Sequence, residues 1–172
     1  MQPLEQLRVI DAWAKRAPLP AVLGFALRCA ERVCSIYTRA VGGEPAAFLH
    51  ELLAKAKVAL EGDPQVIACS ADDVYDVLIA PAADGSLEAF EEMVVSETST
   101  AAAALVSALR ELRRDAVPRV AEALIGIKDT ELHERYGLNH RHENERVIAD
   151  HPEMVEELRW LAEQMGSASD GS

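Results

Sequence analysis

The chain has 172 residues, of which 49% are hydrophobic and 27% charged, and its formal net charge is -12. This composition is typical of one globular domain with a substantial core and excludes a disordered chain. The excess of acidic residues argues against binding to nucleic acid or to anionic membranes, since both attract cationic proteins.

The negative charge is concentrated in the middle of the chain. Residues 1–60 carry eight cationic and five acidic side chains, a net charge of +3. Residues 61–112 carry one cation and eleven acids, a net charge of -10, and residues 113–172 carry eight cations and thirteen acids, a net charge of -5. No Lys or Arg occurs from Val58 to Leu109. This distribution makes the acidity a property of one region.

The N-terminal segment and the cysteines predict a cytoplasmic protein. Glu5 and Asp11 stand where a signal peptide would be apolar, and no apolar run is long enough to cross a membrane. An odd number of cysteines without a CxxC pair favours reduced, buried thiols. These cysteines are Cys29, Cys34 and Cys69.

Apolar residues recur at three- and four-residue steps through the first half of the chain, which predicts α-helices. The first begins at Pro3 and ends before Pro18, and the second runs from about Pro20 to Val41. A third follows from Pro45, and Asp63 with Pro64 marks the start of the next segment. Ser70 and Asp73 resemble a capping box, which predicts a short helix through Tyr75 to Ala80.

The second half of the chain continues this helical pattern. Ser86 is the expected cap of a long helix to about Arg113, in which the residues "SETST" at 96–100 lower helix propensity and would allow a break. Another helix starts near Asp115 and ends at Gly137, residues 139–149 form a short helix or turn, and Asp150 caps the last helix. We therefore predict an all-α fold, a single-domain bundle of six to eight helices over residues 1–165, followed by a disordered polar tail at 166–172.

Four of the five histidines lie among carboxylates in the segment from His133 to His151. Pairs three or four residues apart can share a helix face, so this segment could hold a metal. However, it lacks both HExxH and paired Glu-x-x-His motifs, and arginines alternate with its histidines, which favours a salt-bridged surface. The alternative metal ligands would be His133, His140, His142 and Glu145.

The chain contains no recognisable nucleophile or phosphate-binding motif, neither GxSxG nor GxxxxGK[ST]. Cys34 and His50 could meet in space, but their positions in the sequence do not single them out. We therefore expect no catalytic residue and no cofactor. Whether the protein is an enzyme stays open, with a non-catalytic role favoured.

The acidic middle is the strongest functional signal. Helix capping and helix dipoles explain several of its carboxylates, but they do not explain fifty-two residues without a Lys or Arg. Such a surface would attract a cationic partner. The loop "APAADG" could fold the carboxylates on its two sides toward each other. The residues predicted to bind this partner are Asp72, Asp73, Asp76, Asp84, Glu88, Glu91 and Glu92.

Three segments resemble a group of bacterial all-helical proteins. "LGFALRCAERVCSIYTRA" at 23–40 resembles its second helix, and "TSTAAAALVSALREL" at 98–112 with "ADHPEMVEELRWLAEQM" at 149–165 resembles its Ala-rich and closing helices. The group comprises polymorphic-toxin immunity proteins and a related uncharacterised family. The resemblance implies a protein that binds and neutralises a toxin without catalysis. "DDVYDVLIAPAADG" at 72–85 has no match in this pattern.

The sequence thus predicts a cytoplasmic helical binding protein whose acidic region, residues 61–97, blocks a basic partner, most simply a nuclease toxin. A nuclease presents cations to phosphate, so carboxylates can imitate its substrate. The alternatives are a metal-dependent helical enzyme that uses the segment from His133 to His151, or a bundle of purely structural role. Nucleic-acid and membrane partners are not expected, and homo-oligomerisation stays open.

Overall fold

The structure is a computed structural model of the 172-residue chain, and it describes residues 1–138 and 142–169. Within these residues it contains eight α-helices, three short 3-10 helices and no strand, which confirms the predicted all-α, single-domain bundle. In this part of the chain, no helix combines the length and the apolarity that a membrane span requires. The α-helices are α1 Pro3–Arg16, α2 Leu19–Ala40, α3 Gly43–Leu60, α4 Ala71–Ile79, α5 Ala89–Glu111, α6 Val117–Arg135, α7 His142–Ala149 and α8 Pro152–Ser169, and the 3-10 helices are η1 Pro64–Val66, η2 Ala80–Ala82 and η3 Arg114–Ala116.

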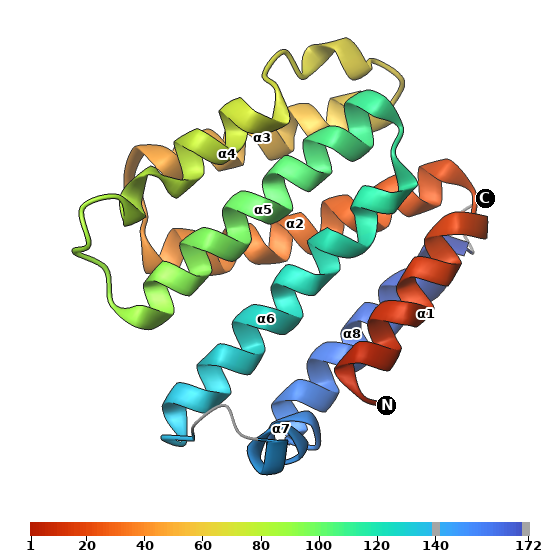
Figure 1. The fold of residues 1–172 in the computed structure, drawn as a ribbon. Coiled ribbons are helices and arrows are strands. Elements are labelled where there is room, and N and C mark those ends of the chain that lie inside the picture. Colours follow the sequence, from red (N-terminus) through yellow and green to blue (C-terminus); the bar gives the residue numbers. More distant parts are fainter. Residues whose placement is uncertain (139–141, 170–172) are drawn as a thin grey trace.

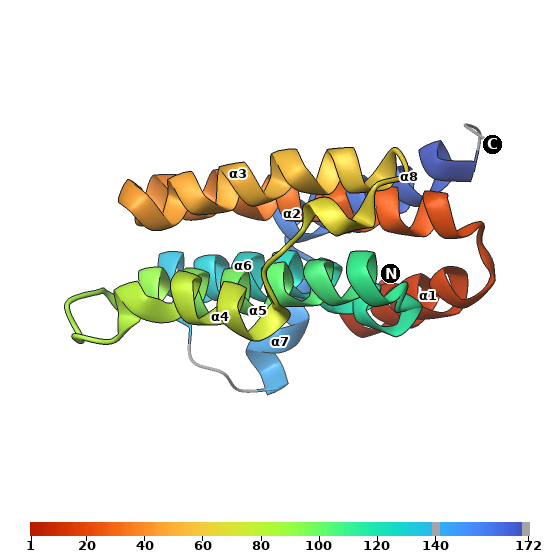
Figure 2. The same ribbon diagram turned by 90° about the horizontal axis from the view of Figure 1, so that it is seen from above.

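The helices form two layers, which Figure 2 shows from above: α2 and α3 make one layer, and α4, α5 and α6 make the other. In Figure 1, α6 lies between α5 on one side and α1 with α8 on the other. α7 is a short helix at the end of the bundle, next to the junction with α8. The layers place α2 in contact with four long helices, namely α3, α5, α6 and α8.

α2 is therefore the central helix of the core. Its apolar side chains at helical spacing are almost fully buried, and Phe25 packs edge-on against Trp13 with ring centroids 5.2 Å apart. Tyr37 is also fully buried, and its hydroxyl donates a hydrogen bond of 2.9 Å to the carbonyl of Leu78 in the last turn of α4. Burial raises the pKa of Tyr37 to about 12, so this donor keeps its proton at neutral pH.

α5 and α6 form the most extensive contact between two helices. Small side chains on both helices allow it: Ala101 and Ala108 of α5 and Ala123 of α6 are buried. At Gly126 a side chain would meet the carboxylate of Glu97, because a Cβ atom built there would lie 3.4 Å from it. The "SETST" segment does not break α5, which is continuous from Ala89 to Glu111. Ser99 is buried, and its hydroxyl donates to the carbonyl of Val95 in its own helix at 2.6 Å.

Three predicted boundaries differ from the structure. The cap of α5 is Glu88 and not Ser86, because Ser86 is bonded to Asp84 in the preceding turn. The side chain that caps the start of α8 is His151 and not Asp150: its Nδ1 accepts a hydrogen bond of 3.2 Å from the amide of Glu153. At the C-terminus α8 continues to residue 169, beyond the predicted end at 165, and residues 170–172 lie outside the described residues.

Candidate functional site: an acidic hairpin and a charged groove

α4, η2, the following turn and the first turn of α5 form a helical hairpin, residues 71–92, which we call the acidic hairpin. α4 packs antiparallel against α5, and Figure 1 shows the connecting turn at the edge of the bundle. Val74 and Leu78 are the buried residues of α4 that attach it to the core. The rest of α4 is exposed: Asp72 and Asp76 lie opposite the buried residues, and Tyr75 and Val77 lie on the two flanks of the helix.

The first group of predicted carboxylates lies on α4. Asp73 forms the predicted capping box with Ser70: the Asp73 amide donates to the Ser70 hydroxyl at 3.1 Å, and the Ser70 amide donates to the Asp73 carboxylate at 3.4 Å. Asp72 and Asp76 are exposed, lie one helical turn apart and have no such structural role. These two carboxylates are therefore available to a partner without loss of a helix cap.

The second group lies at the turn and at the start of α5. Asp84 accepts hydrogen bonds from the amide of Ser86 at 3.0 Å and from its hydroxyl at 2.7 Å, and these bonds lower the pKa of Asp84. Glu88 and Glu91 form a second capping box, in which the Glu88 amide donates to the Glu91 carboxylate at 3.4 Å. Glu92 is exposed beside them, where the positive end of the helix dipole favours an acid.

The hairpin separates the two groups. Because α4 and α5 are antiparallel, their N-termini lie at opposite ends of the hairpin, and capping acids collect at N-termini. The nine residues of α4 span roughly 13 Å, at a rise of about 1.5 Å per residue. The structure thus spreads the predicted carboxylates along one edge and does not gather them at one point. Asp76, in the second half of α4, is the member of the first group that lies closer to the turn.

None of these seven carboxylates lies within ion-pair distance of a Lys or Arg among residues 1–138 and 142–169. Arg110, the nearest cation in the sequence, donates to the carbonyl of Cys69 at 2.7 Å. The sequence pattern is therefore largely preserved in three dimensions, since no described cation pairs with these carboxylates. Glu91 alone among the seven also lines a cavity that it shares with arginines of α2.

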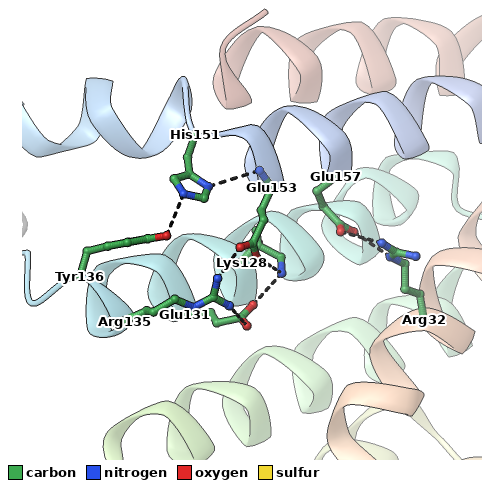
Figure 3. A network of polar contacts seen from close by, with 8 residues as sticks. All are labelled: Arg32, Lys128, Glu131, Arg135, Tyr136, His151, Glu153 and Glu157. Atoms are coloured by element: carbon green, nitrogen blue, oxygen red, sulfur yellow. Dashed lines mark hydrogen bonds and ion pairs between the residues drawn. The ribbon is translucent and has the colours of Figure 1, made fainter.

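A second candidate site is a cavity of about 920 Å³ beside α2, which we call the charged groove. α2, α6, α8 and the start of α5 surround it, and Figure 3 shows this region with α8 and α6 crossing the view and α2 at its edge. Sequence reasoning missed this groove. The available signal was the row of Arg28, Arg32 and Arg39, which recur on one side of a helix whose other side is apolar.

The best-ordered ion pair of the groove joins Arg32 of α2 to Glu157 of α8. The guanidinium donates from Nε and Nη2 to the two carboxylate oxygens at 2.9 and 2.8 Å, and it lies over the ring of Trp160 at 4.5 Å (Figure 3). The Glu157 side chain is only 6% exposed and that of Arg32 is 39% exposed. The pairing therefore neutralises a carboxylate that is otherwise removed from water.

Four further charges form an ion-pair network between α6 and α8 (Figure 3). Glu131 accepts from Lys128 and from Arg135, both at 2.6 Å, and Glu153 accepts from Arg135 and lies 3.6 Å from Lys128. This network confirms that salt bridges interleave the charged part of α6, as the sequence suggested. The pKa of Glu153 is lowered by its hydrogen bond to Arg135.

The histidine segment does not converge on a metal site in the described residues. His133 is buried, and its Nδ1 lies 2.8 Å from the carbonyl of Asp129. His151 caps α8, and its Nε2 lies 3.2 Å from the hydroxyl of Tyr136 (Figure 3). No three His, Cys, Asp or Glu side chains are grouped to bind a metal in this part of the chain. His140, as well as the His142 side chain, lies outside what the structure describes.

Cys34 and His50 do meet: the sulfur lies 3.8 Å from Nδ1 of His50, and Nε2 of His50 lies 3.1 Å from the hydroxyl of Thr38. Burial raises the pKa of Cys34, and it also raises the pKa of Cys29. The thiol is therefore held in its protonated form, which is the poor nucleophile. This contact is a packing contact at the junction of α2 and α3.

Comparison with known proteins finds no matching family model, no matching curated protein and no matching solved structure. The acidic hairpin and the charged groove are therefore the features from which a function can be inferred.

Proposed function

We propose that the protein is a non-catalytic binding protein whose acidic hairpin recognises a basic protein partner. The observation that carries this proposal is the row of seven carboxylates that the fold leaves without any cation in the described chain. Complementary charge accelerates association and selects among partners. An uncompensated acidic edge has this effect on a cationic surface.

The exposed side of α4 also offers apolar contact. Tyr75 is 37% exposed and Val77 is 38% exposed, and at helical spacing they flank the carboxylates of the same short helix on its two sides. Protein interfaces combine a central aromatic or aliphatic anchor with a polar rim, and tyrosine is among the residues enriched at their centres. We therefore place the centre of the interface at Tyr75, with Asp72 and Asp76 at its rim.

The partner class we favour is a nuclease toxin, which would make this chain an immunity protein, in agreement with the sequence resemblance described above. A nuclease must present Lys and Arg side chains to the phosphates of its substrate. A spaced row of carboxylates imitates that substrate and blocks the surface. We place this encounter in the cytoplasm, where the three unpaired cysteines would stay reduced.

The test is the association rate with a basic toxin-like protein encoded beside the gene for this chain, measured by surface plasmon resonance at about 50 and about 500 mM salt. We expect the wild-type rate to fall steeply with salt. The double variant Asp72→Lys/Asp76→Lys should slow association at low salt by about tenfold or more, because it reverses the attraction. Neither residue caps a helix, so the fold should be retained.

The matched control is Glu156→Lys/Glu163→Lys, which makes the same charge change at two exposed carboxylates of α8. It should alter the rate by less than about twofold, since long-range charge alone is screened. Cytochrome c is a control for nonspecific attraction to a basic protein, and it should bind tightly to neither the wild type nor the double variants. Binding that does not depend on salt, or equal rates for the two double variants, would contradict the proposal.

A further inference from the structure

The ion pairs of the charged groove leave a surplus of positive charge. Within the groove Arg32 is paired with Glu157, and Lys128 is paired with Glu131. The cations that line the groove are Arg28, Arg32, Arg39 and Lys128, and the acids are Glu31, Glu91, Glu131 and Glu157.

A third acid of the lining, Glu31, is paired at 2.8 Å with Lys57, which does not line the groove. The charged lining residues outside these three ion pairs are Arg28, Arg39 and Glu91. Neither arginine lies within ion-pair distance of an acid in the described chain. The four cations and four acids of the lining balance each other, and the groove has a net charge of +1 only when Lys57, which pairs with Glu31 from outside the lining, is included.

Two of these guanidinium groups are held in place before any ligand arrives. Arg28 donates from Nε and Nη2 to the side chain and the carbonyl of Gln164, at 2.8 and 3.0 Å. One helical turn further on, Arg32 is held by Glu157 and Trp160. In both arginines Nη1 makes no hydrogen bond to a described residue. α8 thus fixes one edge of each guanidinium and leaves the other edge free to donate.

The acceptors nearby are already used. Both oxygens of Glu157 accept from Arg32, and the two oxygens of Glu131 accept from Lys128 and Arg135. The indole N–H of Trp160 has no acceptor within the described residues. At Arg28, Arg32 and Trp160 the free hydrogen-bonding groups are thus donors, which an anionic head group requires, while Glu91 also lines the groove as an acceptor.

The remaining lining is apolar. Leu124 and Ile127 of α6 and Ile36 of α2 form part of it, with Phe90 and Trp160 as half-buried aromatic side chains. A volume of about 920 Å³ lies within the range of cavities that hold small molecules, which are mostly apolar with a few placed polar groups. The groove is thus large enough for an apolar body of several rings or a short chain.

We propose that the charged groove binds a small amphipathic organic anion. Its carboxylate-like or phosphate-like head lies at the free edges of Arg28 and Arg32, and its apolar body lies along Ile36 and Ile127 toward Phe90. Phe90 and Glu91 line the groove and also belong to the acidic hairpin, so the two sites are neighbours that attract opposite charges. The proposed head group contacts arginines of α2, which the acidic hairpin does not contain, so this inference does not depend on whether the hairpin binds a toxin.

The test compares two fluorescent probes that differ in one anionic group, 1-anilinonaphthalene-8-sulfonate and the uncharged N-phenyl-1-naphthylamine. We expect one sulfonate bound per chain and a lower affinity at high salt. Arg28→Gln should weaken sulfonate binding about tenfold, the effect of losing one charge-assisted hydrogen bond, and should change the affinity for the uncharged probe by less than about twofold. Energy transfer from tryptophan to the sulfonate should fall in Trp160→Phe.

Two more variants keep the test decisive. Arg39→Gln changes an exposed side chain without a described partner, so it should leave the fold intact. It should weaken sulfonate binding about threefold, because it removes one positive charge from the groove. Arg8→Gln removes a similarly exposed cation from α1, outside the groove, and should have no effect. Equal wild-type affinity for both probes, unchanged sulfonate binding in Arg28→Gln, or an equal loss in Arg8→Gln would overturn the proposal.

Discussion

The carboxylates of α8 and those of the acidic hairpin differ in what surrounds them. Glu153 and Glu157 each meet cations that come from other helices, and Glu157 is almost completely buried. Asp72 and Asp76 are exposed and meet no cation in the described chain. In this fold, acids that pair with cations join helices to one another, and acids without such a pair lie at an exposed edge. Each kind should respond differently to substitution.

The largest expected effect is the loss of a buried pairing. Arg32→Met removes the guanidinium but keeps an unbranched stem over Trp160, and it leaves the buried Glu157 carboxylate without a partner. We expect the free energy of unfolding in urea to fall by about 2–3 kcal/mol, less than the roughly 3–5 kcal/mol for a fully buried pair, because Arg32 is partly exposed to solvent.

The matched substitution in the acidic hairpin is Asp76→Asn, which should change the free energy of unfolding by less than about 0.5 kcal/mol. If the two variants lost equal stability, the distinction between paired and unpaired acids would be wrong. Circular dichroism would show that both variants keep their helices.

A smaller effect is expected from the cap of α4. Ser70→Ala removes the hydroxyl that accepts from the Asp73 amide and should cost about 1 kcal/mol. Ser86→Ala is the internal control, because the structure shows that Ser86 bonds Asp84 in a turn and caps no helix. Chemical denaturation of both variants would check this order, and a greater loss for Ser86→Ala would show that α5 depends on the turn.

Glu97 tests a third situation, a half-buried acid. Burial, followed by repulsion from Glu122, raises the pKa of Glu97. The folded protein therefore holds this proton to a higher pH than the unfolded chain does, and stability decreases as pH rises from the ordinary pKa of Glu97 to the raised one. Glu97→Gln should consequently stabilise the protein at pH 7, by less than about 1 kcal/mol because Glu97 is partly screened by water.

At a pH of about 3.5, where a Glu side chain is mostly protonated, Glu97→Gln should have no effect. Thermal melting across this pH range gives the measurement. Glu92→Gln, the same change at an exposed position of the same helix, is the matched control and should not stabilise the protein at pH 7. A Glu97→Gln variant that was destabilised at pH 7 would indicate that the carboxylate makes a favourable contact.

The smallest effect should come from a single reversal on the exposed side of α4. Asp76→Lys replaces a like-charge pair one turn apart by an attractive pair with Asp72. We expect a gain of about 0.2–0.5 kcal/mol, measured by chemical denaturation. Stability gained while partner binding is lost would show that the acidic hairpin is retained for recognition and not for folding.

Local rules predicted much of the fold. Helical spacing, prolines and the Ser70–Asp73 capping box gave helix positions that the structure reproduces within a few residues. They failed at Ser86, which donates its amide and its hydroxyl to Asp84 in a turn, so that α5 begins two residues later with Glu88 as its cap. They also failed at "SETST", because Ser99 satisfies its hydroxyl on the Val95 carbonyl of its own helix.

The candidate site was less accessible to sequence reasoning. The carboxylates of the acidic hairpin could be named, since their spacing and the missing cations are properties of one continuous stretch. The separation of the two groups follows from the antiparallel packing of α4 on α5, which no local pattern specifies. The charged groove was missed altogether, because its central pair joins residues 32 and 157 from distant segments.

The hydrogen bond from Tyr37 to Leu78 has a consequence for motion. α4 has nine residues, which is too short to persist as an isolated helix. Its N-terminus is held by the Ser70 cap, and the Leu78 carbonyl near its C-terminus accepts from Tyr37. In native-state hydrogen exchange, we therefore expect the amides of α2, α5 and α6 to exchange slowly and those of α4 to exchange faster, through opening of α4 as one unit. A partner that binds at Tyr75 would slow the exchange of α4 and leave that of the other three helices unchanged.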